Sequence, residues 1–115
     1  MVIGASLKPW RYSHMAVKAL KKHGVPVIAV GLREGEIDNI PVVRELPLNI
    51  DIHTVTMYVG AGRQPEFYDY LVRLRPGRVI FNPGAENDEL AEMLSRQNIE
   101  ILEACTLVML STGQY

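Results

Sequence analysis

The chain has 115 residues, of which 48% are hydrophobic and 22% are charged, and its formal net charge is −1 at pH 7. These values are typical of globular proteins, and the length predicts one domain, residues 1–115, with a core that needs neither disulfides nor a metal. The near-neutral charge argues against nucleic acid or an anionic membrane as the partner.

The chain begins with a predicted strand, turn and helix. Met1 to Ile3 is an apolar run that stops at Gly4, as a buried strand does before a tight turn. Ser13 is the predicted N-cap of the following helix, and Gly24 permits a left-handed stop at its end. Four positions at helical spacing form the predicted buried face: Ala16, Ala19, Leu20 and His23.

Two further strands follow, separated by an irregular segment. Val25 to Val30 is a continuous apolar run that suits a strand buried on both faces, and Gly31 closes it. Leu32 to Leu48 shows no sustained period and is predicted to be a surface excursion with room for a short strand and a turn. Ile52 to Val59 is the next predicted strand.

The last third of the chain repeats the alternation. Pro65 opens a predicted helix that ends at Pro76-Gly77, and Arg78 to Phe81 is a short strand. Asn87 or Asp88 caps the next helix. The two helices place these residues inward: Phe67, Tyr70, Leu71 and Leu74 in the first, and Leu90, Met93, Leu94 and Gln97 in the second. Ile99 to Leu102 is the last predicted strand.

Five apolar strands alternating with helices predict a Rossmann-like α/β domain in three layers. Its five-stranded, mainly parallel sheet carries helices on both faces. In such sheets ligands bind beyond the carboxyl ends of the strands, where the strand order reverses. The predicted turns at this edge are Gly4, Gly31, Gly60 and Pro83-Gly84.

The turn Gly4 to Ser6 is a predicted phosphate site. A glycine after the first strand lets the backbone approach a ligand, and the next helix directs its free N–H groups at the same place. Lys8 and Arg11 add positive charge, and the hydroxyls of Ser6 and Ser13 can donate hydrogen bonds. The alternative is an ordinary strand-to-helix turn with solvated cations.

The end of the second strand narrows the choice of ligand. A site for NAD has an acidic residue there, whereas this chain has Gly31-Leu32-Arg33. An arginine suits a ribose that carries its own phosphate, as in NADP and coenzyme A, although Arg33 can also be a solvated loop residue. NADP normally spans two mononucleotide-binding halves, and the chain has little more than one. Gly60 to Gly62 is interpreted as a turn, because Pro65 stands where a third glycine would fall.

No catalytic or metal-binding cluster emerges from the sequence. Cys105 is the only cysteine, which excludes an intrachain disulfide and favours a reducing, cytoplasmic location. Of the histidines, only His14 lies near the predicted ligand turn, as a capping or anion-contact residue. His23 and His53 lie elsewhere. No signal peptide, membrane span or metal-ligand spacing is present.

The order and spacing of several groups of residues match those of a known family. These groups are Val2 to Ser6 with Pro9, Ala19 to Ile28, Glu36-Ile37 before Pro41, Asp51, Phe81 to Gly84, Asn87 to Glu89, and Cys105. Together they resemble the small stand-alone CoA-binding proteins related to the N-terminal domain of the succinyl-CoA synthetase α subunit. The resemblance covers nearly the whole chain and implies a non-catalytic domain that binds coenzyme A or acyl-CoA through its 3′-phospho-ADP moiety.

The resemblance also implies a set of contacts. The pyrophosphate would lie against Gly4, Ala5, Ser6, Arg11, Tyr12 and Ser13. The adenosine would meet Arg33 and its neighbours, including Gly31, and Tyr58 and Val59 would flank it. The pantetheine side would be lined by Pro83, Gly84 and Asn87.

Three positions depart from the family's pattern. Gly31-Leu32 stands where Asn-Pro is frequent, Glu103-Ala104 removes an arginine before Cys105, and Trp10 is bulky where small or polar residues are common. Trp10 either stacks on a ligand or fills part of the site.

Other functions stay open. One is an enzyme, either a small NADP-dependent reductase or a CoA-thiol redox protein that uses Cys105. Another is a regulatory subunit or homo-oligomer, for which the apolar segment Thr106 to Leu110 is either an interface or packed on its own sheet.

Overall fold

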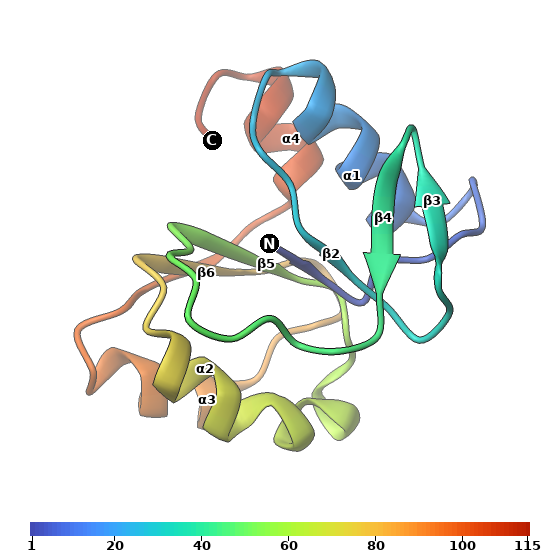
Figure 1. The fold of residues 1–115 in the computed structure, drawn as a ribbon. Coiled ribbons are helices and arrows are strands. Elements are labelled where there is room, and N and C mark those ends of the chain that lie inside the picture. Colours follow the sequence, from blue (N-terminus) through green and yellow to red (C-terminus); the bar gives the residue numbers. More distant parts are fainter.

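The computed structural model describes residues 1–115 and contains one seven-stranded sheet with helices on both faces (Figure 1). The strands are β1 (Val2–Ile3), β2 (Ala29–Val30), β3 (Gly35–Ile37), β4 (Ile40–Val43), β5 (Thr54–Met57), β6 (Arg78–Phe81) and β7 (Glu100–Glu103). Their order in the sheet is β3-β4-β2-β1-β5-β6-β7. All neighbours are parallel except β3, which is antiparallel to β4.

The strand order reverses at β1. Ile3 pairs with Val30 of β2 on one side and with Met57 of β5 on the other. The chain first builds β2 and β4 on one side of β1 and then returns to build β5, β6 and β7 on the other. The carboxyl end of β1 is therefore the switch point at which open α/β sheets bind ligands.

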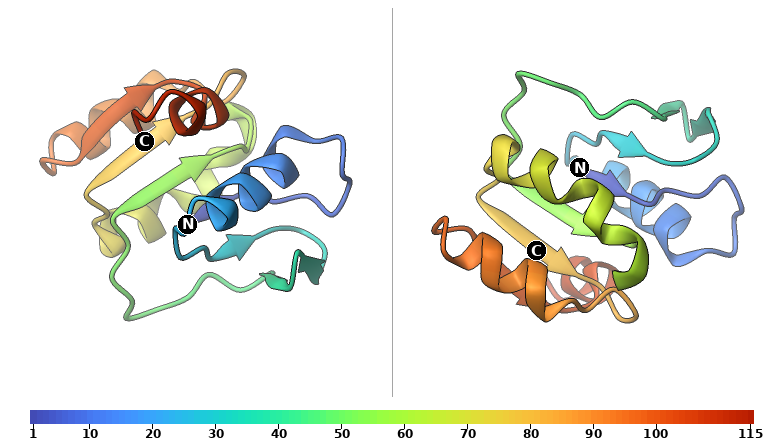
Figure 2. Two further views of the ribbon diagram at one scale, coloured as in Figure 1. Left: turned by 90° about the horizontal axis from the view of Figure 1, so that it is seen from above. Right: turned by 90° about the horizontal axis from the view of Figure 1, so that it is seen from below.

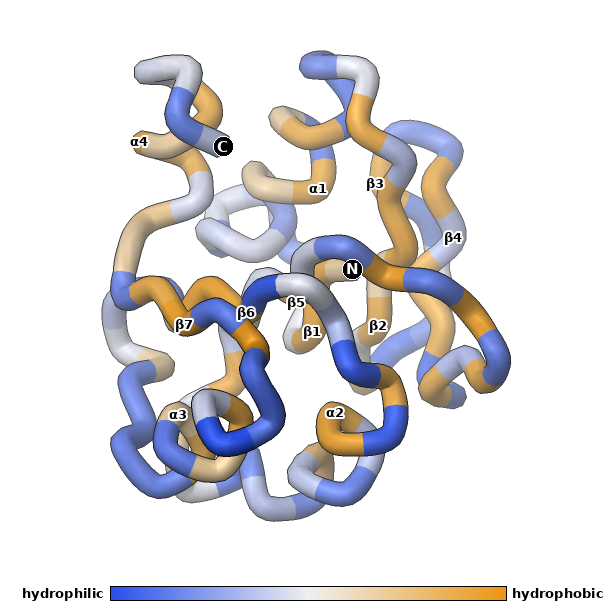
Figure 3. The backbone as a smooth tube through the Cα atoms, turned by 90° about the vertical axis from the view of Figure 1, so that its left-hand side faces the viewer, coloured by the Kyte–Doolittle hydropathy of each residue, from blue (hydrophilic) through white to orange (hydrophobic).

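The helices cover the two faces in pairs. Helix α1 (Tyr12–Lys22) and the short α4 (Thr106–Ser111) lie together on one face. A 3-10 helix, η1 (Ala61–Phe67), leads into α2 (Tyr68–Leu74), which lies with α3 (Asp88–Ser95) on the other face (Figure 2). The hydropathy tube in Figure 3 shows apolar strand segments between these helix pairs. None of the helices has the length and apolar character that crossing a membrane requires.

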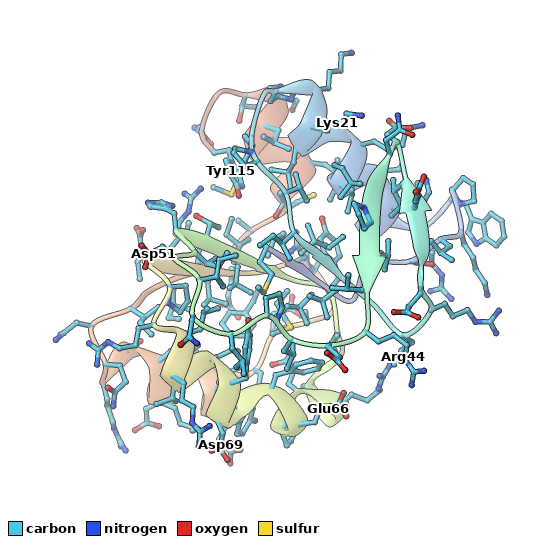
Figure 4. The ribbon with its side chains drawn as sticks, viewed as in Figure 1. Lys21, Arg44, Asp51, Glu66, Asp69 and Tyr115 are labelled. Atoms are coloured by element: carbon cyan, nitrogen blue, oxygen red, sulfur yellow. The ribbon has the colours of Figure 1, made fainter.

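Alternating residues of the strands feed two apolar cores. Ile3, Met57 and Phe81 belong to the core beneath α2 and α3, whereas Val2 and Leu20 belong to the core beneath α1. On the face covered by α1 and α4, Arg78 at the start of β6 donates a 2.8 Å hydrogen bond to the carbonyl oxygen of Tyr115, which is labelled in Figure 4, and its guanidinium lies 4.6 Å from the centroid of that ring. The C-terminal segment thus closes the sheet face beside α4.

The predicted three-layer Rossmann-like fold is confirmed, with two more strands than expected. The irregular segment Leu32–Leu48 contains the hairpin β3–β4, whose turn residues Asp38 and Asn39 adopt positive φ angles of 49° and 68°. These are residue types that tolerate left-handed backbone. The hairpin lies at the sheet edge, where most of its positions are exposed, so no apolar period identified it.

The strand count affects the choice of ligand. The six parallel strands follow the order β4-β2-β1-β5-β6-β7, which is the arrangement of a complete dinucleotide-binding sheet. The expected half-sized sheet was therefore wrong, and size alone does not separate coenzyme A from NADP.

Smaller corrections concern the helix ends. The N-cap of α1 is Arg11 rather than Ser13, because the helix begins two residues earlier than predicted and Ser13 lies buried in its first turn. His23 is the exposed C-cap and not a buried residue. Pro65 lies inside η1 and does not open a helix, and α2 ends at Leu74 with Arg75, whose φ is 49°, as its C-cap. The predicted left-handed stop at Gly24 and the predicted N-cap at Asn87 are confirmed.

Candidate functional site

The turns after β1, β2, β5 and β6 meet at the carboxyl edge of the sheet, and the first two are in very close contact. A Cβ atom added to Gly31 would lie 2.2 Å from the carbonyl oxygen of Ala5. Gly4 has a φ of +95°, and a Cβ there would lie 3.0–3.2 Å from atoms of Tyr58 and Val59. Glycine is therefore required at both positions, and it packs the turn after β1 between β2 and β5.

The amides of this turn divide into two groups. Gly4 N and Ala5 N both donate to the carbonyl oxygen of Val30, at 2.9 and 2.8 Å, so they cannot also bind a phosphate. The next two amides, of Ser6 and Leu7, have no acceptor. The amides that can bind a phosphate are therefore those of Ser6 and Leu7, and not those of Gly4 and Ala5.

The N-terminus of α1 supplies more free donors. No side chain caps the helix, and the first-turn amides of Tyr12, Ser13 and His14 have no backbone acceptor. Uncapped first-turn amides together with the positive end of the helix dipole favour an anion. No acidic residue lies in that turn.

Hydrogen bonds within the loop fix its shape. Ser6 Oγ accepts from the Lys8 amide at 3.1 Å, and the Arg11 amide donates to the Lys8 carbonyl at 3.1 Å. His14 Nδ1 donates to the Ser6 carbonyl at 2.8 Å, which ties the helix to the turn. A carbonyl only accepts, so the proton lies on Nδ1 and Nε2 is the free nitrogen.

Three predicted cations surround these donors without carboxylate partners. Lys8, Arg11 and Arg33 are exposed, and the ion pairs of the structure are Arg63–Glu66 and Arg96–Glu92. None of the three makes an ion pair in the structure.

Sequence reasoning missed a fourth cation, Arg44. The pairing of Val30 with Val43 places Arg44 directly after β4, level with Gly31 after β2, and Figure 4 shows it at that end of β4. It makes no ion pair. Arg44 was missed because its place at the carboxyl edge follows from β4, which was not recognised as a strand of the parallel sheet.

The loop after β5 presents backbone rather than side chains. Val59 is buried in the core, and the amides of Val59, Gly60, Ala61 and Gly62 have no acceptor. The predicted flanking residue Tyr58 points its hydroxyl inward, toward Thr56, Thr106 and Cys105. That oxygen is buried without a hydrogen-bond partner, since the two threonine hydroxyls bond each other at 2.6 Å.

Burial raises the pKa of Tyr58 from 10.0 to about 12. The unfolded phenol ionises first, so the stability that this group contributes is complete below pH 10 and is lost as the pH rises toward 12. We expect Tyr58→Phe to match or exceed the wild type in stability at neutral pH, because no hydrogen bond is lost, and to exceed it increasingly above pH 10. Urea unfolding of both proteins at neutral pH and above pH 10 tests this. A loss of more than about 1 kcal/mol at neutral pH would instead reveal a hydrogen-bond partner.

The loop after β6 is held by hydrogen bonds that range from exposed to partly buried. Gly84 has a φ of +91° and its amide donates to Glu86 Oε1 at 2.8 Å. Asn87 caps α3 through Leu90 N and donates to Gln64 Oε1 and the Tyr68 hydroxyl, both at 2.9 Å. The side chain of Asn87 is therefore occupied by the protein, while Pro83 and Gly84 are exposed at the edge.

Gln64 connects the loop after β5 to the loop after β6, and sequence analysis did not identify it as a site residue. It is fully buried, and its Nε2 donates to the carbonyl oxygens of Val59 at 2.8 Å and Ala85 at 2.7 Å. It thereby fixes the loop after β5 to the loop after β6. No local pattern marks it, because all of its partners come from other elements or loops.

The reactive side chains are dispersed. Cys105 is half-buried at the N-cap of α4, His53 precedes β5 at the opposite edge, and His23 ends α1. His14 is the one histidine at the phosphate turn. The structure contains no group of three or more His, Cys, Asp and Glu side chains placed to hold a metal ion.

The chain resembles known proteins over almost its full length. The sequence profile of a family described as a CoA binding domain matches residues 1–111. An uncharacterised protein of known crystal structure is 43% identical, with a TM-score of 0.92, and the match covers 99% of this chain and 94% of that one. A Thermus thermophilus protein is 22% identical, with a TM-score of 0.86 and coverages of 99% and 87%. A Pyrococcus horikoshii protein described as hypothetical is 23% identical, with a TM-score of 0.79 and coverages of 90% and 72%. No match is found among curated proteins.

Proposed function

Because the chain belongs to the CoA-binding domain family, we propose that it binds coenzyme A or an acyl-CoA along the carboxyl edge of its sheet and has no catalytic activity of its own. The observation that carries the binding mode is the uncapped N-terminus of α1, where Tyr12, Ser13 and His14 amides lack acceptors beside the free amides of Ser6 and Leu7. The pyrophosphate binds there, next to Arg11 and Lys8.

The two ends of the ligand run in opposite directions from the pyrophosphate. Arg33 and Arg44 follow β2 and β4, and neither makes an ion pair, which supports the 3′-phosphate on that side. Pro83 and Gly84 lie on the β5–β6 side, which leaves that side for pantetheine. Asn87 acts there as the residue that holds the loop and not as a ligand contact, since its amide group is already hydrogen-bonded.

The proposed lack of catalysis rests on the separation of the reactive groups. His14 lies at the start of α1 and Cys105 at the start of α4, and no hydrogen bond links a histidine to the cysteine. A cysteine nucleophile is commonly activated by an adjacent base or cation, and no hydrogen bond from a histidine, lysine or arginine reaches Cys105.

The second candidate is an NADP-binding protein, which the six-strand order favours. Calorimetric titration with coenzyme A, 3′-dephospho-CoA and NADPH separates the two. We expect coenzyme A to bind more tightly than NADPH. Binding of NADPH alone would overturn the proposal in favour of the reductase-type function.

Arg33→Ala tests the 3′-phosphate contact. We expect it to weaken coenzyme A binding roughly 5- to 10-fold, because one charge-assisted contact is lost, and to leave 3′-dephospho-CoA binding unchanged. Calorimetry with both ligands is the measurement, and Arg73→Ala, at an exposed cation of α2, is the control. Equal losses for the two ligands would contradict the assignment of Arg33 to the 3′-phosphate.

A further inference from the structure

Large apolar side chains are exposed at one part of the carboxyl edge. Five such residues are exposed in the whole structure. Two lie in the loops that follow β1 and β2, Trp10 at 70% and Leu32 at 66% exposure, and Tyr12, at 71%, is the first residue of α1. Of the other two, Leu48 lies in the loop between β4 and β5 and Val108 lies on α4. Single exposed apolar residues are ordinary, whereas a concentration at a binding edge indicates a contact surface.

Trp10 is held on an ordered turn. The turn is closed by the Arg11 amide on the Lys8 carbonyl and by Ser6 Oγ on the Lys8 amide. Leu7 anchors it against the start of β3, since a Cβ on Gly35 would lie 2.8 Å from a methyl carbon of Leu7. Figure 2 shows this loop beside the β2–β3 connection in both views. The backbone that carries the exposed indole is therefore held by hydrogen bonds and by the packing of Leu7.

The charges around the indole match a phosphorylated nucleoside. The Lys8 ammonium lies 6.0 Å from the centroid of the Trp10 ring, and Arg11 is the next residue along the chain. Arg33 follows Leu32 on the neighbouring loop, and neither arginine makes an ion pair. A flat ring with an ammonium group beside it, on a loop that also carries an arginine, suits an aromatic base whose sugar carries phosphate.

We propose that Trp10 stacks on the adenine ring of the bound coenzyme A, with Lys8 and Arg33 beside the phosphates of the same nucleoside. This inference rests on the proposed function. It gives the exposed indole a role, and it makes the β1–α1 loop part of the adenosine site as well as of the pyrophosphate site.

The chain contains a single tryptophan, so its fluorescence reports on this position alone. We expect coenzyme A and 3′,5′-ADP to quench the emission, with excitation at the red edge of the indole band, where adenine does not absorb. Trp10→Ala is expected to weaken both ligands roughly 5- to 100-fold, whereas Trp10→Phe retains most of the affinity because the ring is kept. Val108→Ala, at an exposed apolar residue of α4, is the control and is expected to bind like the wild type.

The outcomes are distinguishable. If calorimetry detects coenzyme A binding but the emission is unchanged and Trp10→Ala binds like the wild type, adenine lies elsewhere and the inference is wrong while the proposed function stands. If the wild-type protein binds no coenzyme A, the proposed function fails and the inference with it. Thermal unfolding of each variant shows that the fold is intact.

Discussion

Gly31→Ala is expected to lower the free energy of unfolding by about 3 kcal/mol and to weaken coenzyme A binding at least about tenfold. The new Cβ would lie 2.2 Å from the carbonyl oxygen of Ala5 and 3.0 Å from Cγ1 of Val42. Both neighbours are buried, so the clash is relieved only if the turn after β1 moves away from β2. That movement displaces Ser6 and Leu7, whose free amides belong to the proposed pyrophosphate site.

Gly62→Ala is the matched control for this variant. An added Cβ at Gly62 meets no atom within 4 Å, and the residue lies in the first turn of η1. Its stability is expected to stay within about 0.5 kcal/mol of the wild type. Urea unfolding and calorimetry are the measurements. If Gly31→Ala behaves like Gly62→Ala in both, the close approach of the two turns has no functional importance.

Asn82→Leu is expected to cost about 2–4 kcal/mol of stability. Asn82 Nδ2 donates to Thr56 Oγ1 at 2.6 Å and to the Met57 carbonyl at 3.0 Å, and its Oδ1 accepts from the Thr106 amide at 2.8 Å. The residue is 1% exposed, so leucine leaves the buried Thr106 amide without an acceptor, whereas Thr56 Oγ1 keeps its bond to Thr106 Oγ1 and the Met57 carbonyl keeps the backbone amide of residue 82. Because the Thr106 amide begins α4, the loss is expected to loosen that helix more than the rest of the fold.

Two measurements separate this effect from a general loss of packing. Hydrogen exchange should increase at the α4 amides of Met109 and Leu110 more than at α1. The double variant with Thr56→Val should cost less than the sum of the two single variants, because the residues share one network. If the stability losses of the two single variants add up, and if hydrogen exchange increases equally in α4 and α1, then Asn82 does not specifically hold the start of α4.

Local patterns predicted the elements on which the site depends. The apolar run that ends at Gly4 and the run that ends at Gly31 located both turns, because buried parallel strands are continuous in sequence. The Asn87 cap and the buried Leu90 and Leu94 of α3 were also visible, since both depend on residues within one helix, whereas Met93 is only partly buried and Gln97 lies beyond the helix.

The features that were missed depend on contacts between distant residues. Whether Gly4 and Ala5 amides are free depends on the Val30 carbonyl across the sheet. The importance of Arg44 follows from strand pairing, and that of Gln64 from two loops. Arg11 became the N-cap of α1 although it has no capping side chain. An uncapped helix start has no sequence signature, and here it is the feature that favours a bound anion.

In the proposed binding mode, coenzyme A lies at the carboxyl edge with its pyrophosphate on the start of α1. Amide NMR of the protein during titration with coenzyme A tests this mode residue by residue. We expect the largest shifts at Ser6, Leu7 and Tyr12 to His14, whose amides have no acceptor in the structure. Gly4 and Ala5, which already donate to Val30, should shift less. Saturable shifts confined to α2 and α3, or none at all, would contradict the account.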